Sequence, residues 1–316
     1  MALLGEPPLV AERIERTVHG ALAPLSYVPQ GSLRAGRVRR HGVEAAPANR
    51  LAHETRRCYM RAGAVPNAAG SAFVEQGRTK VIATVFGPRQ AGERAQRDGG
   101  GGAARGFLAV DLQFAPFASR VTSREEGSRR AILYSSLLQS SLESVVLLER
   151  YGKTAFDVSL IVLEDDGSVL PAALTAASLA FADANIEMRD LVAGATVHLV
   201  SETDDCQKGT ARSLLLDCDG DEERVMPAGS AVVHLGLCTS RGSVCLLHSA
   251  GPLPIHSFEQ MVLLAKETAE AIGAQMRRCL ESTTASRASK RMRLATEVDQ
   301  GTQDDDTLAN GYNQEE

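Results

Sequence analysis

Short stretches of alternating apolar and polar residues begin near residue 57 and predict a β-rich start to the folded part of the chain. CYMRAGAV, SAFVEQ and TKVIATVFG are three such stretches, and the turn signals Pro66-Asn67 and Gln76-Gly77-Arg78 separate them. This order predicts an antiparallel meander. GFLAVDLQF and AFDVSLIVL follow as two further strands, because alternate side chains of a strand point to opposite faces of a sheet.

Three segments have the helical period instead. Residues 128–150 carry an apolar stripe at three- and four-residue spacing. Residues 171–184 begin with Pro171, which suits the first position of a helix. Their many small side chains predict a helix that packs closely against its neighbours in the centre of the fold. Residues 257–280 form the last predicted helix.

The second half of the chain repeats the alternation of strands and helices. Four more strands are predicted, at residues 190–200, 212–217, 230–238 and 243–248. Strands followed by a helix, and then strands and a helix again, indicate an α+β sheet-and-helix sandwich. The fold class predicted from the pattern is therefore α+β.

The apolar pattern occupies one continuous stretch, which predicts a single domain over residues 52–282. Residues 1–51 contain five prolines, which break any long helix, and we expect a flexible N-terminal extension there. Residues 283–316 lose the apolar period and hold more acidic than basic residues. We expect a disordered acidic tail in that segment.

Composition narrows the function classes. The formal net charge of the 316 residues is −5, and the acidic tail carries most of it, so the rest is near neutral. This is not a generally basic nucleic-acid binder, although a local basic patch is compatible with it. The 4% aromatic content argues against a stand-alone RNA-binding module that stacks bases. No apolar run approaches the roughly 18–20 residues of a transmembrane helix, so we expect no membrane partner.

Cysteine and histidine spacing argues against a metal centre. The six cysteines include no CxxC pair, and the seven histidines form no HExxH. Reduced thiols in a cytosolic or nuclear protein are the expected state. The sequence also lacks a Walker A motif, a GxSxG elbow and the kinase motifs, and we expect no cofactor.

Acidic residues cluster at two turns. Asp165 and Asp166 could share a proton in catalysis, but their place between a strand and a helix favours a capping role. The second cluster lacks the spacing of an EF-hand, so a solvated turn is favoured over a cation site. This cluster comprises Asp217, Asp219, Asp221, Glu222 and Glu223.

Three stretches resemble a known family in the same order along the chain. They are RAGAVPNAAGSAFVEQGRTKVIATVFGPRQ, LEDDGSVLPAALTAASLAFADANIEMRDLVAG and SLLLDCDGDEE. Together they resemble the RNase PH superfamily, and they are most similar to a ring subunit of the eukaryotic RNA exosome. The resemblance implies an RNase PH-like fold, also called ribosomal protein S5 domain 2-like.

The resemblance also implies where a family active site would lie. Active members are phosphorolytic exoribonucleases, and one of their phosphate-binding arginines is matched by Arg130. Their Gly-Thr/Ser-Arg phosphate loop falls on Ser168-Val169-Leu170, where Leu170 replaces the arginine. Their acidic pair is matched by Asp217 and by Glu223, which is one methylene longer. The loop is thus degenerate.

The resemblance therefore implies a non-catalytic structural subunit rather than an enzyme. Its implied partners are other RNase PH-like subunits in a hetero-hexameric ring, RNA-binding cap subunits, and RNA undergoing 3′→5′ processing, rRNA maturation or turnover. We expect it in the nucleus and nucleolus and also in the cytoplasm. The alternative is an active phosphate-dependent 3′→5′ exoribonuclease that uses Arg130, Asp217 and Glu223.

The resemblance suggests that several arginines surround the central channel of the ring. They are the candidate RNA contacts, because arginine binds phosphate without regard to base sequence. Ordinary salt bridges to nearby acids such as Glu125 and Glu126 are the alternative role for these side chains. The candidates are Arg89, Arg120, Arg124, Arg129 and Arg130.

Overall fold

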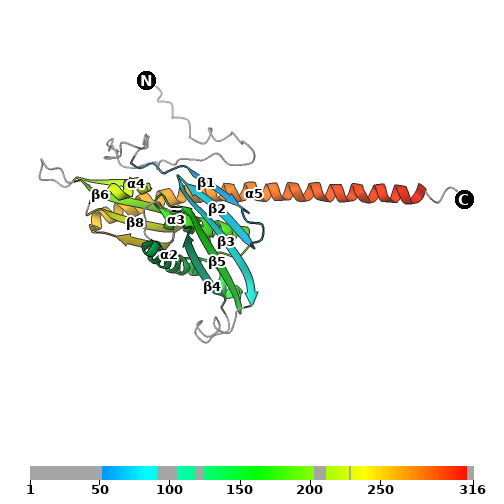
Figure 1. The fold of residues 1–316 in the computed structure, drawn as a ribbon, viewed down its shortest axis with the longest axis horizontal. Helices are drawn as coiled ribbons and strands as arrows, with labels where there is room; N and C mark the ends of the chain where they lie inside the picture. Colours follow the sequence, from blue (N-terminus) through cyan, green and yellow to red (C-terminus); the bar gives the residue numbers. More distant parts are fainter. Residues whose placement is uncertain (1–51, 91–104, 119–123, 203–210, 228, 312–316) are drawn as a thin grey trace, which may run out of the picture.

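The computed structural model describes residues 52–90, 105–118, 124–202, 211–227 and 229–311. Two sheets account for its strands (Figure 1). The first has five strands in the order β1 (Cys58–Ala62), β2 (Gly70–Gln76), β3 (Thr79–Gln90), β5 (Thr154–Glu164) and β4 (Phe107–Phe114). The second has four strands in the order β7 (Ala211–Leu216), β6 (Val192–Glu202), β8 (Ala231–Cys238) and β9 (Val244–Ala250).

The strand pairing confirms the predicted meander, since β1, β2 and β3 pair antiparallel in succession. β5 then pairs antiparallel with β3 and parallel with β4. All pairings in the second sheet are antiparallel. Sheet and helix layers of this kind confirm the α+β sandwich.

The helices are α2 (Arg124–Val145), α3 (Val169–Asp183), the short α4 (Gly220–Val225) and α5 (Ile255–Gly311), and a 3₁₀ turn covers Leu148–Arg150. α3 contacts β2 and β3 of the first sheet and β6 of the second, so it lies between the two sheets. α5 covers the other face of the second sheet, and α2 packs on β4 and β9. The core is therefore centred on α3.

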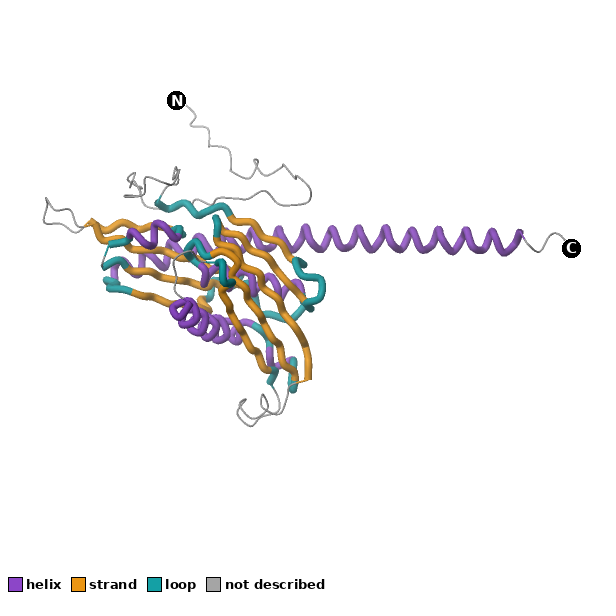
Figure 2. Tube along the Cα trace, viewed as in Figure 1, coloured by secondary structure: helices purple, strands orange, loops and turns teal. Residues whose placement is uncertain are grey.

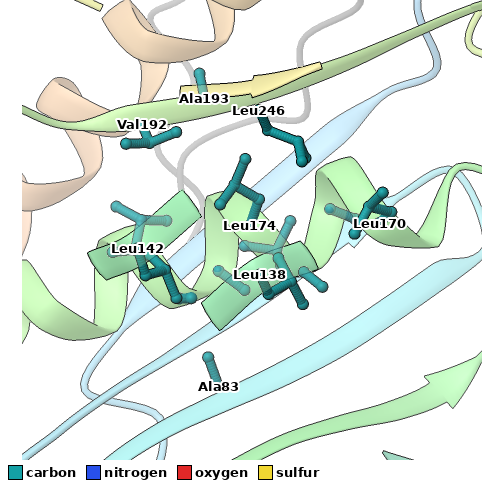
Figure 3. Close-up of a cluster of buried hydrophobic side chains, with 14 of the residues drawn as sticks. Ala83, Leu138, Leu142, Leu170, Leu174, Val192, Ala193 and Leu246 are labelled. Carbon is teal, nitrogen blue, oxygen red and sulfur yellow. The ribbon is translucent and has the colours of Figure 1, made fainter. Parts of the chain in front are cut away.

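Small residues let α3 approach both sheets closely, as its sequence predicted. A Cβ at Gly70 would lie 2.3 Å from the Ala180 carbonyl oxygen, and a Cβ at Gly194 would lie 2.5 Å from Pro171 Cα. Only glycine fits at these two contacts. Figure 3 shows Leu170 and Leu174 of α3 in the cluster that holds Leu138 and Leu142 of α2.

The start of α3 differs from the sequence prediction. The helix begins at Val169, so Pro171 is its third residue and not its first. Proline is still tolerated there, because the amide groups of the first turn have no partner within the helix. Ser168 precedes the helix in the left-handed conformation, with a φ of 54°.

The last helix continues past residue 280, where the sequence analysis ended it, and α5 runs without a break to Gly311 (Figure 2). Over residues 283–311 the structure thus has a helix where a disordered segment was expected. Residues 284–289 are all exposed, so the apolar period is lost where the helix leaves the body. No proline interrupts it. Residues 1–51, the expected N-terminal extension, lie outside the described residues.

None of the described helices combines the length and the hydropathy that crossing a membrane would require.

Candidate functional site

A pocket of about 600 Å³ opens where the start of α3 meets α2 and the second sheet. Ser168 and Val169 at the start of α3 line it, as do Arg130 of α2 and Glu223 of α4. Four of the six residues matched to the family site therefore line one pocket. The other two, Leu170 and Asp217, are almost completely buried, with exposed fractions of 0% and 1%.

Arg130 is held in place by three neighbours. Its Nη1 lies 3.0 Å from Asp165 Oδ2, and its guanidinium packs over the rings of Phe114 and Tyr134 at 5.2 and 5.6 Å. Burial works against the charge, but Tyr134 and Asp165 outweigh it and raise the pKa of Arg130 above its usual value. The arginine is thus charged, and Asp165 already compensates that charge.

The degenerate phosphate loop contributes little to bind an anion. Leu170 points into the core, and Val169 is 2% exposed, so neither side chain offers a polar group to the pocket. The Ser168 hydroxyl is buried and has no hydrogen-bond partner among the described residues. Ser168 Oγ is therefore the polar side-chain atom that this loop leaves at the pocket wall.

Glu223 lies against the start of α3. Its Oε1 accepts a hydrogen bond from the Ser168 backbone N–H at 3.3 Å. The same oxygen would be 2.9 Å from a Cβ at Gly167, so a larger residue there would displace it. Backbone N–H groups and the helix dipole make a helix N-terminus attractive to anions. In this chain its own carboxylate occupies that place.

Asp217, the other acid of the pair, has a different partner. Its Oδ1 lies 2.7 Å from Arg56 Nη2, and its Oδ2 accepts from the Arg56 backbone N–H at 2.9 Å. Burial would lower the pKa of Arg56, but the charge of Asp217 outweighs it and raises that pKa. Both carboxylate oxygens are engaged, so the solvated turn predicted around Asp217 is wrong for this residue.

Arg56 joins three segments of the chain behind the pocket. Beyond Asp217, it donates to the backbone oxygens of Asp166 at 2.6 Å and Gly167 at 3.1 Å. It also donates to Thr79 Oγ1 at 3.3 Å. The side chain is 6% exposed. This buried network fixes the turn before α3 relative to Asp217.

Two histidines complete the pocket wall. His198 Nε2 on β6 lies 3.5 Å from Glu223 Oε1 and has no hydrogen-bond partner among the described residues. His234 Nδ1 on β8 is 3.0 Å from Thr196 Oγ1, and its ring stacks on His248 at 5.8 Å between centroids. Burial, together with the nearby His198, lowers the pKa of His234 to about 3. His234 is therefore neutral at physiological pH.

The acidic pair at the turn before α3 does not cap that helix, contrary to the sequence interpretation. The N-cap position belongs to Ser168. Asp165 instead pairs with Arg130, and Asp166 Oδ2 lies 3.5 Å from Arg56 Nη1. Burial raises the pKa of Asp166, although the charge of Arg56 opposes this. Across the part of the chain that the structure describes, no three His, Cys, Asp or Glu side chains form a metal-binding group.

Among the candidate RNA-binding arginines whose side chains are described, Arg89 lies apart from Arg129 and Arg130. Arg129 and Arg130 lie near the start of α2, but Arg89 at the end of β3 pairs with Asp157 near the start of β5. Asp157 on β5 and Asp165, which follows the last residue of β5, are eight residues apart, or roughly 26 Å at 3.3 Å per residue. The side chain of Arg124 is not described, and Arg120 lies outside the described residues.

Sequence reasoning missed Arg56 and the two histidines. The alternation of a strand could have indicated Arg56, because residues two apart point to the same face. Arg56 lies on the face of the buried residues Cys58, Met60 and Ala62, whereas Arg57 is exposed. Strands β6 and β8 are buried on both faces, so their pattern shows no preferred side for His198 or His234.

The two-sheet sandwich around a central helix, with a pocket at the start of that helix, defines the class as an RNase PH-type domain. The sequence profile described as "3′ exoribonuclease family, domain 1" matches residues 54–187. "Exosome complex component MTR3" of Homo sapiens is 43% identical over 196 residues, which cover 60% of this chain and 70% of that protein. "Exosome complex component Rrp41" of Pyrococcus horikoshii is 33% identical over 253 residues, covering 79% and 91%.

The chain therefore belongs to the RNase PH family, and the resemblance found in the sequence is confirmed. Among solved structures, rice (Oryza sativa) Rrp46 superposes with a TM-score of 0.60 at 22% identity. The alignment covers 74% of this chain and 98% of that one. This match confirms the RNase PH-like fold.

Proposed function

We propose that this chain is a non-catalytic structural subunit of an RNA exosome core ring. The observation that carries the proposal is the placement of Glu223 at the start of α3, where its carboxylate accepts from the Ser168 N–H. A phosphate nucleophile at that helix end would meet this carboxylate without the arginine that the family resemblance places at position 170, where Leu170 is buried. Replacing one cation of a desolvated anion site by an apolar group, as at Leu170, costs about 2–5 kcal/mol of binding.

The rest of the acidic machinery supports the same proposal. Asp217 is buried and paired with Arg56, so it presents no free carboxylate oxygen to a metal ion. Arg130 faces the pocket with its charge compensated by Asp165. A site of this kind retains the architecture of a phosphorolytic enzyme without its anion pocket.

The ring role rests on the relatives. The human and archaeal proteins of similar sequence are named as exosome complex components. In this proposal the chain assembles with other RNase PH-like subunits into a hetero-hexameric ring that also seats RNA-binding cap subunits. The ring threads RNA for 3′→5′ processing and decay, including rRNA maturation, in the nucleus, nucleolus and cytoplasm. Arg129 and Arg130 are its candidate phosphate contacts among the described arginines.

The first test is phosphorolysis by the purified full chain. A labelled RNA with a free 3′ end is incubated with inorganic phosphate, and the release of nucleoside diphosphates is measured. We expect no release above that of a no-protein control. Phosphate-dependent release that falls with an Arg130→Ala substitution would overturn the proposal and favour the active exoribonuclease, which uses Arg130, Asp217 and Glu223.

The second test is assembly state. The tagged protein is purified gently from its own cells, and its native mass and subunit composition are measured. We expect near-equal amounts of several other chains in one assembly of several hundred kilodaltons. A lone chain or a homo-oligomer would contradict the ring role, whatever the outcome of the activity assay.

A further inference from the structure

We propose that Cys238 and Cys245 form a redox-sensitive thiol pair, which hydrogen peroxide converts into an intramolecular disulfide between β8 and β9. The pair lies outside the pocket described above. The proposal does not depend on the ring function.

A β-bulge brings the two cysteines together. β8 and β9 pair with Leu237 opposite Val244 and Gly236 opposite Leu246, which leaves Cys245 as the extra residue. Cys238 continues the ladder, since its N–H donates to the Ser243 carbonyl oxygen at 2.8 Å. An extra residue of this kind is unpaired and its side chain is redirected.

The sulfur of Cys245 lies on the same face of the sheet as Cys238. A Cβ built on Gly236 would be 3.2 Å from Cys245 Sγ. Gly236 and Cys238 are two residues apart on β8, so they face the same way. The absent side chain of Gly236 leaves the space that Cys245 Sγ fills, so both thiols lie on one face of the β8–β9 pair.

The two thiols differ in a way that suits stepwise oxidation. The hydrogen bond from Cys245, with a second one from Ser243, lowers the pKa of Cys238 to about 6. The same hydrogen bond, together with burial, raises the pKa of Cys245. Cys238 is therefore the thiol of the pair that ionises more readily, and Cys245 is the one that keeps its proton. Cys238 is buried, but Cys245 beside it is partly exposed, which gives a small oxidant a path to the pair.

The other described cysteines, Cys58, Cys218 and Cys279, are all buried. Burial raises the pKa of Cys58 to about 12, and burial likewise raises that of Cys279. Cys58 and Cys279 are both buried, and Cys279 Sγ donates to the Met60 carbonyl oxygen. Protonated thiols away from solvent react slowly with peroxides, so we expect oxidation to be confined to the β8–β9 pair.

The chemistry proceeds in two balanced steps. The Cys238 thiolate attacks one peroxide oxygen, the O–O bond breaks, and with one proton taken up the products are a sulfenic acid and water. The Cys245 thiol then attacks the sulfenic sulfur, the S–S bond forms, and a second water leaves with the thiol proton. The two sulfurs lose two electrons in total, and the peroxide gains them.

The disulfide would join the edge strand β9 to β8. β9 has a neighbour on one side only, and it carries the exposed residues Val244 and Leu247. Its far end, Ala250, lines the pocket. A covalent link across the bulge removes the fraying of this edge, because it constrains the strand in the locally opened state.

The test is a disulfide map of the full chain under native conditions. The reduced protein is treated with hydrogen peroxide, quenched, alkylated and digested, and the linked peptides are identified by mass spectrometry. We expect one link, between Cys238 and Cys245, with a mass loss of about 2 Da for the two hydrogens removed. Reduction by dithiothreitol should restore both thiols.

Two variants complete the test. Cys245→Ala should abolish the link and, because it removes the hydrogen bond that lowers the pKa of Cys238, should also slow the reaction of Cys238 with peroxide. Cys279→Ala should leave the link unchanged. No link in the wild-type protein, or a link that involves any cysteine other than Cys238 and Cys245, would overturn the proposal. The wild-type map requires no substitution, so a variant that fails to fold does not affect that result.

Discussion

The family resemblance suggests that Asp217 and Glu223 correspond to one acidic pair, yet the structure gives the two residues opposite environments. Asp217 is buried and holds Arg56 through both carboxylate oxygens. Glu223 is on the pocket wall and meets the N–H of Ser168 at the start of α3. One acid therefore stabilises the fold, while the other fills a place that an anion would take.

The comparison shows that residue type alone does not define a catalytic carboxylate. What matters is which cation or donor already holds it. Asp217 retains the family residue but is fully engaged by Arg56, and Glu223 departs from the family residue but remains at the site. We therefore expect substitutions on the Asp217 side to change stability, and substitutions on the Glu223 side to change what the pocket accepts.

The largest expected effect is on the Asp217 side. Arg56→Met should lower the free energy of unfolding by about 3–5 kcal/mol, because it leaves a buried carboxylate without its counter-charge. Urea denaturation of the full chain measures this loss. The matched control is Arg57→Met, because the side chain of Arg57 is next in sequence and exposed. We expect its free energy of unfolding to change by no more than about 0.5 kcal/mol. Equal losses in the two variants would contradict the buried network.

The next largest effect is the pH dependence of stability that arises from His234 on the pocket wall. The pKa of His234 falls from 6.5 to about 3 on folding, so between these values the unfolded chain binds more protons. The stabilisation that depends on neutral His234 should therefore be fully present above pH 6.5. It should be lost as the pH falls, which lowers the free energy of unfolding by about 2 kcal/mol at pH 5.

Urea denaturation at pH 7 and pH 5 measures this decrease. His234→Gln lacks the titrating group, so its loss between the two pH values should be smaller than that of the wild-type protein. An unchanged pH dependence in the variant would assign the effect to other groups.

A smaller effect is expected at Glu223. Glu223→Gln keeps an acceptor for the Ser168 N–H but removes the charge, and it should cost about 1 kcal/mol of stability through the lost interaction with the helix dipole. Inorganic phosphate should then raise the melting temperature of the variant but not of the wild type. Glu126→Gln, which also removes a pocket carboxylate, is the control. Equal phosphate effects in both variants would indicate a general change of pocket charge.

The smallest effect concerns RNA. Arg129 is exposed, whereas the charge of Arg130 is compensated by Asp165. Arg129→Ala in the assembled complex should lower the salt dependence of RNA binding by about one phosphate contact, and Arg130→Ala should lower it less. Binding isotherms at several salt concentrations measure both slopes. A larger effect at Arg130 would mean that RNA displaces Asp165.

Much of the fold could be predicted from the sequence because its signals are local. The alternation of apolar and polar residues predicted the strands, and the alanine-rich segment predicted a central helix. The close contacts of that helix at Gly70 and Gly194 depend on small residues. The end of α5 was missed, because a helix that leaves the body loses the apolar face that marks it.

The site was less predictable because its contacts are long-range. Ser168 and Glu223 are 55 residues apart, and Arg56 and Asp217 are 161 apart. Contacts between residues so far apart in sequence produce no periodic signal in the local sequence pattern. The resemblance suggested which positions would form the site, but only the folded chain shows that Asp217 pairs with Arg56 and Glu223 with the start of α3.

The position of α3 between the two sheets also has a consequence for biosynthesis. The first sheet is complete once the ribosome has made Glu164, and α3 follows at once. Its second face is covered by β6 and β8 of the second sheet, and that sheet is complete only at Ala250. Roughly 70 residues must be made in between, which takes roughly 4–14 seconds at translation rates of about 5–20 residues per second. During that time the nascent chain carries an apolar helix with one side uncovered, and this is the interval in which we expect chaperones to bind it.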